Sequence, residues 1–97
     1  MKNKIILVTT EGCEACNIMS NLIKRALLYD MMQAKSINYI EMDFKDFKKS
    51  QFKAKQITDF PTMLFVNGNE IVNTYTGTNT IGFIISESMK CFGANNN

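Results

Sequence analysis

Two cysteines, Cys13 and Cys16, stand where a short apolar run at residues 5–8 gives way to a helical pattern that begins near Ala15. An uninterrupted apolar run of this length is typical of a buried strand in the middle of a sheet. Apolar side chains then recur at intervals of three and four up to about Gln33, which predicts a helix with one packed face. We therefore expect a central strand that leads through a short turn into a helix whose start carries both cysteines.

This placement favours one thiol as a nucleophile. Cys13 lies at the predicted helix N-terminus, and Cys16 lies one turn further along on the same side. The unpaired backbone N–H groups of a first helical turn and the positive end of the helix dipole stabilise an anion, so they lower the pKa of the Cys13 thiol. A thiol with a pKa of about 8.5 is roughly 3% ionised at pH 7, and one with a pKa of about 7 is roughly half ionised. Cys16 is near enough to close a disulfide with Cys13.

Half of a zinc site has the same cysteine spacing, which makes a structural metal the first alternative. Zinc normally takes four ligands, whereas this chain has no histidine and only one further cysteine, Cys91, near its C-terminus. We therefore expect no metal and no other cofactor. A C-x-x-C pair beside a strand–helix–strand pattern instead favours redox chemistry. We expect Cys91 to be a partly covered, small hydrophobic residue of the last helix.

The length of 97 residues predicts a single domain, residues 1–97, with a flexible polar tail at 93–97. The net charge of +2 is too small to indicate binding to nucleic acid or to an anionic membrane. The apolar run at residues 5–8 is too short for a signal peptide, and no run reaches transmembrane length. We expect a cytoplasmic monomer, and in that compartment a C-x-x-C pair is more often catalytic than structural.

The remaining elements follow from similar patterns. Residues 37–43 are predicted to form a second strand, with Ile40 and Met42 pointing inward, and residues 44–56 a second helix. The five lysines of that helix are interpreted as a solvated face rather than a nucleic-acid site. A strand at 63–66, an Asn67-Gly68 hairpin turn and a return strand at 71–75 come next. A final helix, capped by Thr78 or Asn79, completes the chain.

The order of these elements, with C-x-x-C closing the first strand, resembles the thioredoxin fold. Residues 57–62, which hold the only proline, Pro61, resemble the thioredoxin segment that ends in a cis-proline followed by threonine. The hairpin and Gly77 fall at thioredoxin positions within a residue. The resemblance covers essentially the whole chain. Thioredoxins usually begin with an additional strand and helix, whereas this chain starts directly at the cysteine-bearing strand, as glutaredoxins do. It implies an α/β fold, a minimal βαβ-ββα arrangement with a central four-stranded mixed sheet flanked by helices.

The resemblance also implies roles for individual residues. Cys13 matches the nucleophile of the family and Cys16 the resolving cysteine. Pro61 matches the proline that faces the pair, so the Phe60–Pro61 bond should be cis, leaving the Phe60 backbone free to pair with an extended substrate segment. Gly77 matches a glycine that keeps the third loop of the site close and open.

Several positions depart from the thioredoxin pattern. Gly12, which we still include in the substrate-binding site, replaces a tryptophan that offers partners a flat apolar contact. Leu7 replaces the buried aspartate that accepts the proton of the resolving thiol, a residue that glutaredoxins also lack. Glu11 and Glu14 flank Cys13 and oppose thiolate formation, with no basic residue between Lys4 and Lys24 to offset them. The expected pKa of Cys13 is therefore about 7 or somewhat above.

The leading interpretation is a thioredoxin-like thiol–disulfide oxidoreductase that acts on protein disulfides. A flavoprotein disulfide reductase or glutathione would return it to the reduced form. A glutaredoxin-like, glutathione-linked oxidoreductase is the alternative within the same chemistry, although Thr10 stands where glutaredoxins often have a basic residue. The competing class is a non-enzymatic interaction module with the same fold. The lost tryptophan and aspartate favour this module, whereas the retained cysteines and proline favour the enzyme.

Overall fold

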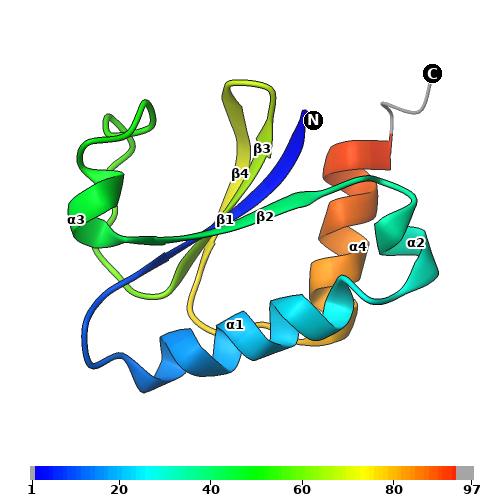
Figure 1. Ribbon diagram of the computed structural model, residues 1–97, viewed down its shortest axis with the longest axis horizontal. Coiled ribbons are helices and arrows are strands. Elements are labelled where there is room, and N and C mark those ends of the chain that lie inside the picture. Colours follow the sequence, from blue (N-terminus) through cyan, green and yellow to red (C-terminus); the bar gives the residue numbers. More distant parts are fainter. Residues whose placement is uncertain (1, 94–97) are drawn as a thin grey trace.

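Within residues 2–93, which the computed structural model describes, a four-stranded mixed sheet carries helices on both faces (Figure 1). The elements follow one another as β1 (Asn3–Thr9), α1 (Glu14–Ala26), α2 (Asp30–Gln33), β2 (Asn38–Asp43), α3 (Phe44–Phe47), β3 (Thr62–Asn67), β4 (Glu70–Thr76) and α4 (Ile81–Phe92). The strand order is β2-β1-β3-β4, with β1 parallel to β2 and the other two pairings antiparallel. The predicted α/β fold with a central mixed sheet is confirmed.

Strand β1 lies in the centre of the sheet, as its apolar run predicts. The four side chains of residues 5–8 are at most 1% exposed. Ile5 and Leu7 pack with residues of α1 and α4 on one face, and Ile6 and Val8 pack with Phe47 of α3 on the other. Each such side chain contributes about 1.5–3 kcal/mol by its burial. The end of β1, from which the cysteine loop departs, is therefore held firmly on both faces.

The first helix is shorter than predicted. It ends at Ala26 rather than near Gln33, and the short helix α2 follows after a turn. The apolar pattern continues through this break, so the pattern alone does not reveal it. The turn lets Met32 reach the core, where it is fully buried, while Leu28 remains 71% exposed.

The second predicted helix is also shorter, because α3 ends at Phe47 and turns occupy most of the following residues. The Ser50 hydroxyl donates a hydrogen bond to the Phe47 carbonyl and accepts one from the Phe52 N–H group. Such local bonds of a serine compete with the helical pattern. The resulting turns bury Phe52 and Ile57 against the α3 face of the sheet.

The hairpin and the last helix differ from the prediction by one or two positions. Asn67 belongs to β3, and the two-residue turn is Gly68–Asn69, with Gly68 at a φ of +67°. A glycine with positive φ at the first turn position suits a type II′ hairpin. Thr80, rather than Thr78 or Asn79, caps α4 and accepts a hydrogen bond from the Phe83 N–H group at 3.0 Å.

Residues 94–97 of the predicted polar tail lie outside the described residues, and Gly93 is the C-cap of α4. In the described range, no helix combines the length and apolar character needed to cross a bilayer. Over the same residues, no three His, Cys, Asp or Glu side chains gather closely enough to hold a metal ion.

Candidate active site

Three loops meet at one end of the sheet, the edge that is formed by strand ends and not by an outer strand. Strand β1 ends at this edge, β3 begins there and β4 ends there, because β3 is antiparallel to both neighbours. Val8 of β1 pairs with Thr62 of β3, which in turn pairs with Thr76 of β4. The cysteine loop, the segment before β3 and the loop after β4 therefore emerge side by side (Figure 1). This arrangement brings all six predicted site residues to the same edge.

The two cysteines occupy the start of α1. Cys13 is the N-cap residue, and its Sγ accepts a hydrogen bond from the Cys16 N–H group at 3.0 Å. The two side chains are joined in a disulfide, with Cα atoms 5.2 Å apart. Cys16 is 3% exposed, whereas Cys13 is only partly buried. The first turn of the helix thus directs a backbone donor at the Cys13 sulfur, which is the contact that stabilises a thiolate.

The segment before β3 has the expected cis bond between Phe60 and Pro61. The Thr62 hydroxyl donates a hydrogen bond to the Asp59 carbonyl at 2.6 Å, which closes this turn. The Phe60 ring meets the Phe44 ring edge-on, with centroids 5.1 Å apart. This ring contact ties the segment before β3 to the start of α3.

Two glycines shape the loops around the pair. Gly12 has a φ of +71° and Gly77 a φ of +80°, in the left-handed region that other residues enter at a cost. The Gly77 N–H group donates a hydrogen bond to the Pro61 carbonyl at 2.8 Å, which joins the third loop to the second. A Cβ at either glycine would meet nothing within 4 Å. Backbone conformation, rather than lack of space, is therefore what calls for glycine at both positions.

A groove of about 540 Å3 lies beside the cysteine loop. It is lined by Thr10, Glu11, Asp43, Phe44, Lys45 and Lys48. The parallel pairing of Thr9 with Asp43 brings the start of α3 next to residues 10 and 11. The two lysines thus share a groove with Glu11, although no basic residue lies between Lys4 and Lys24 in the sequence. Only the strand register, which the sequence does not state, could have revealed this neighbourhood.

A second groove, of about 550 Å3, lies on the α1 side of the site. Ile18 and Leu22 of α1 form one wall, and residues 78–82 form the other. Ile18 is 50% exposed, and the Asn79 N–H group donates to the Met19 sulfur at 3.4 Å. The loop after β4 is thereby held against the helix that carries the cysteines.

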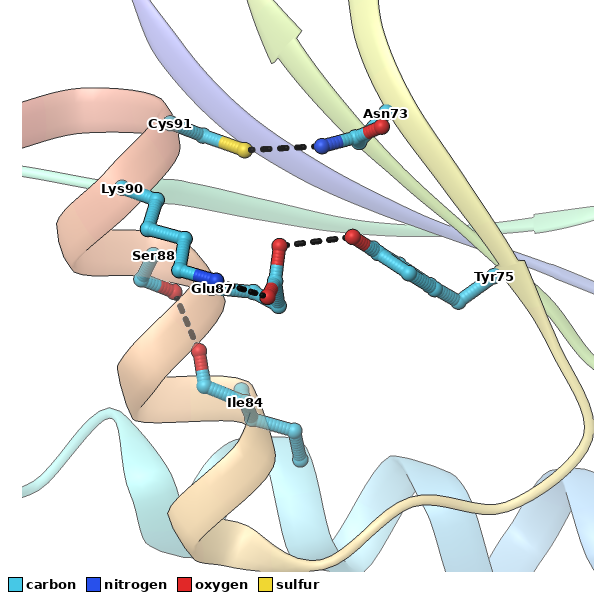
Figure 2. A network of polar contacts seen from close by, with 7 residues as sticks. All are labelled: Asn73, Tyr75, Ile84, Glu87, Ser88, Lys90 and Cys91. Carbon is cyan, nitrogen blue, oxygen red and sulfur yellow. Dashed lines mark hydrogen bonds and ion pairs between the residues drawn. The ribbon is translucent and has the colours of Figure 1, made fainter.

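Cys91 lies away from this edge, in the network drawn in Figure 2. It is ten residues along α4 from Ile81, which corresponds to about 15 Å of helix. Its Sγ accepts a hydrogen bond from Asn73 Nδ2 at 3.8 Å. Burial raises the pKa of the Cys91 thiol, and the charge of Glu87 adds to this effect. Cys91 is partly buried, as the sequence predicts.

The first strand of a central mixed sheet leads into a helix that begins with C-x-x-C, and a cis-proline precedes β3 at the same edge. These features define a cysteine-pair site on an α/β fold. No family model matches the sequence, and no curated protein matches it. Solved structures do match the fold, and three of them are thioredoxins.

Three of these structures illustrate the likeness. Thioredoxin-2 of a malaria parasite, described as a component of its protein secretion machinery, has a TM-score of 0.75 at 15% identity, covering 92% of this chain and 82% of its own. The thioredoxin of Malassezia sympodialis has a TM-score of 0.72 at 13% identity, covering 92% and 74%. Chloroplastic thioredoxin z has a TM-score of 0.71 at 11% identity, covering 93% and 78%. The chain has the thioredoxin fold, as the sequence resemblance implies.

Proposed function

We propose that this protein is a thiol–disulfide oxidoreductase that reduces protein disulfides through Cys13 and Cys16. The observation that carries the proposal is the N-cap position of Cys13, whose sulfur accepts the Cys16 N–H group at 3.0 Å. The same contact that orders the helix start favours the ionised form of Cys13, and the thiolate is the attacking species in disulfide exchange.

The reaction takes place in two exchanges. The Cys13 thiolate attacks one sulfur of a substrate disulfide, and the other substrate sulfur leaves as a thiolate that takes up a proton. Cys16 then loses its proton and attacks the Cys13 sulfur, which releases the second substrate thiol. The substrate gains two electrons and two protons, and Cys13 and Cys16 become a disulfide.

The edge where the three loops meet would hold the substrate. Phe60 precedes β3 and lies outside its ladder, which supports the proposal that its backbone pairs with an extended segment that brings a disulfide to Cys13. Gly12, Pro61 and Gly77 come from the three loops and would line the path of that segment. The groove with Lys45 and Lys48 extends this surface on the β2 side.

The partners follow from this chemistry. Protein disulfides are the proposed substrates, and a flavoprotein disulfide reductase or glutathione is the proposed electron donor. We propose a monomer in the cytoplasm, where the pair would be kept reduced, with no role in binding nucleic acid or membrane. A glutaredoxin-like, glutathione-linked activity is the second candidate. The fully buried Leu7 favours it, because glutaredoxins also lack the aspartate found in thioredoxins at that position.

Reduction of insulin disulfides in the presence of dithiothreitol tests the proposal. The wild-type protein should accelerate the reduction, and Cys13→Ser should bring the rate to that of dithiothreitol alone. Replacing dithiothreitol with glutathione and glutathione reductase distinguishes the glutaredoxin-like candidate. A wild-type protein that accelerates neither reaction would favour the non-enzymatic interaction module.

A further inference from the structure

We propose that Glu41, hydrogen-bonded to Ser20 beside the helix turn of Cys16, takes up the proton that Cys16 loses in the second exchange. The inference rests on the proposed function and names a residue that supports it. The proton acceptor would then be a carboxylate on the outer strand β2. The central strand β1 has only Leu7 at the corresponding position, and a leucine cannot accept a proton.

A proton acceptor is needed because Cys16 is buried. Its exposed fraction is 3%, and burial in an apolar environment keeps a thiol protonated. Cys16 must lose this proton as its sulfur attacks the mixed disulfide. Leu7 packs among apolar residues on the same face of the sheet and has no group that could accept it.

The strand register places Glu41 next to this position. Leu7 of β1 is paired directly with Glu41 of β2, and neighbouring strands lie about 4.8 Å apart. Ile40 and Met42 pack on the α3 face of the sheet, whereas Tyr39 packs on the α1 face. Because side chains alternate along a strand, Glu41 shares the α1 face with Tyr39. The carboxylate is thus displaced from the Leu7 position by a single strand.

Ser20 connects this carboxylate to the helix that carries the cysteines. Its hydroxyl donates a hydrogen bond to Glu41 Oε2. Ser20 follows Cys16 by four residues, so the two side chains are neighbours on one helix face, with Cβ atoms about 5–6 Å apart. Both residues are less than 10% exposed. A hydroxyl that donates to Glu41 retains lone pairs that can accept from the Cys16 thiol.

The surroundings of Glu41 keep it ionised. Burial acts to raise the pKa of Glu41, but hydrogen bonds from Ser20 and Tyr39, together with Lys24 at 3.9 Å, outweigh it and lower the pKa. Tyr39 donates to the same Oε2 atom at 2.7 Å, and its own pKa is raised by burial and by this bond, so it remains a donor. The nearby carboxylate of Asp43 is turned to the Lys45 N–H group at 2.9 Å.

The step balances without any further reactant. The Cys16 proton passes to the Ser20 hydroxyl as the Ser20 proton passes to Glu41. The Cys16 sulfur bonds to the Cys13 sulfur, and the bond between Cys13 and the substrate sulfur breaks. The substrate sulfur leaves with the electron pair as a thiolate, and the proton on Glu41 returns to that thiolate or to solvent.

A mixing experiment with the chromogenic disulfide DTNB separates the two exchanges. Reduced protein carrying Cys91→Ala, which removes the third thiol, is mixed in excess with DTNB. The first equivalent of coloured thiolate reports attack by Cys13, and the second reports attack by Cys16. A proton acceptor supplied by the protein itself makes the second rate independent of pH between about pH 6 and pH 8, because its carboxylate stays ionised there.

The Glu41→Gln variant should slow the second release by about 100-fold at pH 7 and make its rate rise about tenfold per pH unit. Ser20→Ala should slow the second release by a smaller factor and give the same dependence on pH. Glu70→Gln is the control, because Glu70 lies on β4, the outer strand on the other side of the sheet, and its rate should match that of the parent protein. A steep profile in the parent protein, or an unchanged rate in Glu41→Gln, would overturn the role of Glu41. If Glu41→Gln does not fold, the parent profile and Ser20→Ala decide. Absence of the first release would instead refute the proposed function, and with it this inference.

Discussion

Cys13 and Cys91 are both partly buried cysteines near helix ends, yet they lie at opposite ends of the helix dipole. Cys13 caps the N-terminus of α1 and receives a backbone N–H group at its sulfur. Cys91 lies in the last turn of α4, where the helix dipole is negative, and Glu87 lies one turn before it (Figure 2). Burial and the Glu87 charge raise the pKa of Cys91.

The two cysteines show that exposure alone does not identify a reactive thiol. Both side chains are partly exposed. They differ in which end of a helix they occupy and in which charged groups face them. The proposed reactive site of this chain is thus defined by the direction of α1 and by the loops that meet at its start.

The largest expected difference between the two cysteines is in activity. Cys13→Ser should lower insulin reduction to the uncatalysed rate, because the attacking sulfur is lost. Cys91→Ala should keep the wild-type rate within about twofold, because its thiol is held protonated and lies away from the site. Parallel assays of both variants, with melting curves to verify folding, make the measurement. Loss of activity in a folded Cys91→Ala protein would break the distinction between the two thiols.

A second large effect concerns covalent trapping. Cys16→Ser should accumulate mixed disulfides through Cys13, because the resolving sulfur is missing. The double variant Cys13→Ser, Cys16→Ser retains Cys91 and should trap almost nothing. Non-reducing gels after incubation with a disulfide-containing protein provide the readout. Equal trapping by the two variants would mean that Cys91 is the reactive thiol.

A smaller effect is expected near Cys91, on the pKa of Tyr75. The hydrogen bond from the Tyr75 hydroxyl to Glu87, at 2.6 Å, raises the pKa of Tyr75 to about 12. Glu87→Gln should lower that pKa towards the ordinary value of about 10, as read from phenolate absorbance against pH. An unfolded tyrosine ionises near pH 10, so the stabilisation from this bond is complete below about pH 10 and is lost as the pH rises towards 12. An unchanged Tyr75 titration in Glu87→Gln would show that Glu87 does not raise the pKa of Tyr75.

The smallest expected effect concerns the acidic flank of Cys13. Glu14→Gln should lower the pKa of the Cys13 thiol by less than about one unit and raise the reduction potential of the pair. Glu11→Gln should have a weaker effect, because Lys45 and Lys48 share the groove of Glu11. Thiolate absorbance against pH, and equilibration with glutathione, measure the two quantities. A larger effect from Glu11 than from Glu14 would show that the two lysines do not offset Glu11.

The central strand and the cysteine-bearing helix start could be predicted from the sequence because local patterns determine them. Each of these features depends on a few neighbouring residues: the apolar run at residues 5–8 predicts a buried strand, the C-x-x-C pair a helix start, and Pro61 a cis bond. The ends of the helices could not be predicted as well. The end of α1 at Ala26 depends on how Met32 reaches the core, which is a tertiary effect. The end of α3 at Phe47 depends on the local Ser50 hydrogen bonds and on the packing of Phe52 into the core.

The charged neighbours of the site could not be predicted, because they come from a separate strand. Glu41 lies opposite Leu7, and Asp43 opposite Thr9, only through the register of β1 with β2. The resemblance to thioredoxins implies that Leu7 stands where they have an aspartate, but the sequence does not show which residue lies beside Leu7. Parallel pairing has no local signal comparable to a hairpin turn.

The pH dependence of alkylation at each thiol, followed in one sample of reduced protein by mass spectrometry, tests the central claim most directly. We expect Cys13 to react fastest at neutral pH and to titrate below the ordinary thiol value of about 8.5. Cys91 should react slowly and titrate above its ordinary value, because burial and Glu87 oppose its thiolate. If Cys91 titrated together with Cys13, or below it, the proposed contrast between the two helix ends would be contradicted.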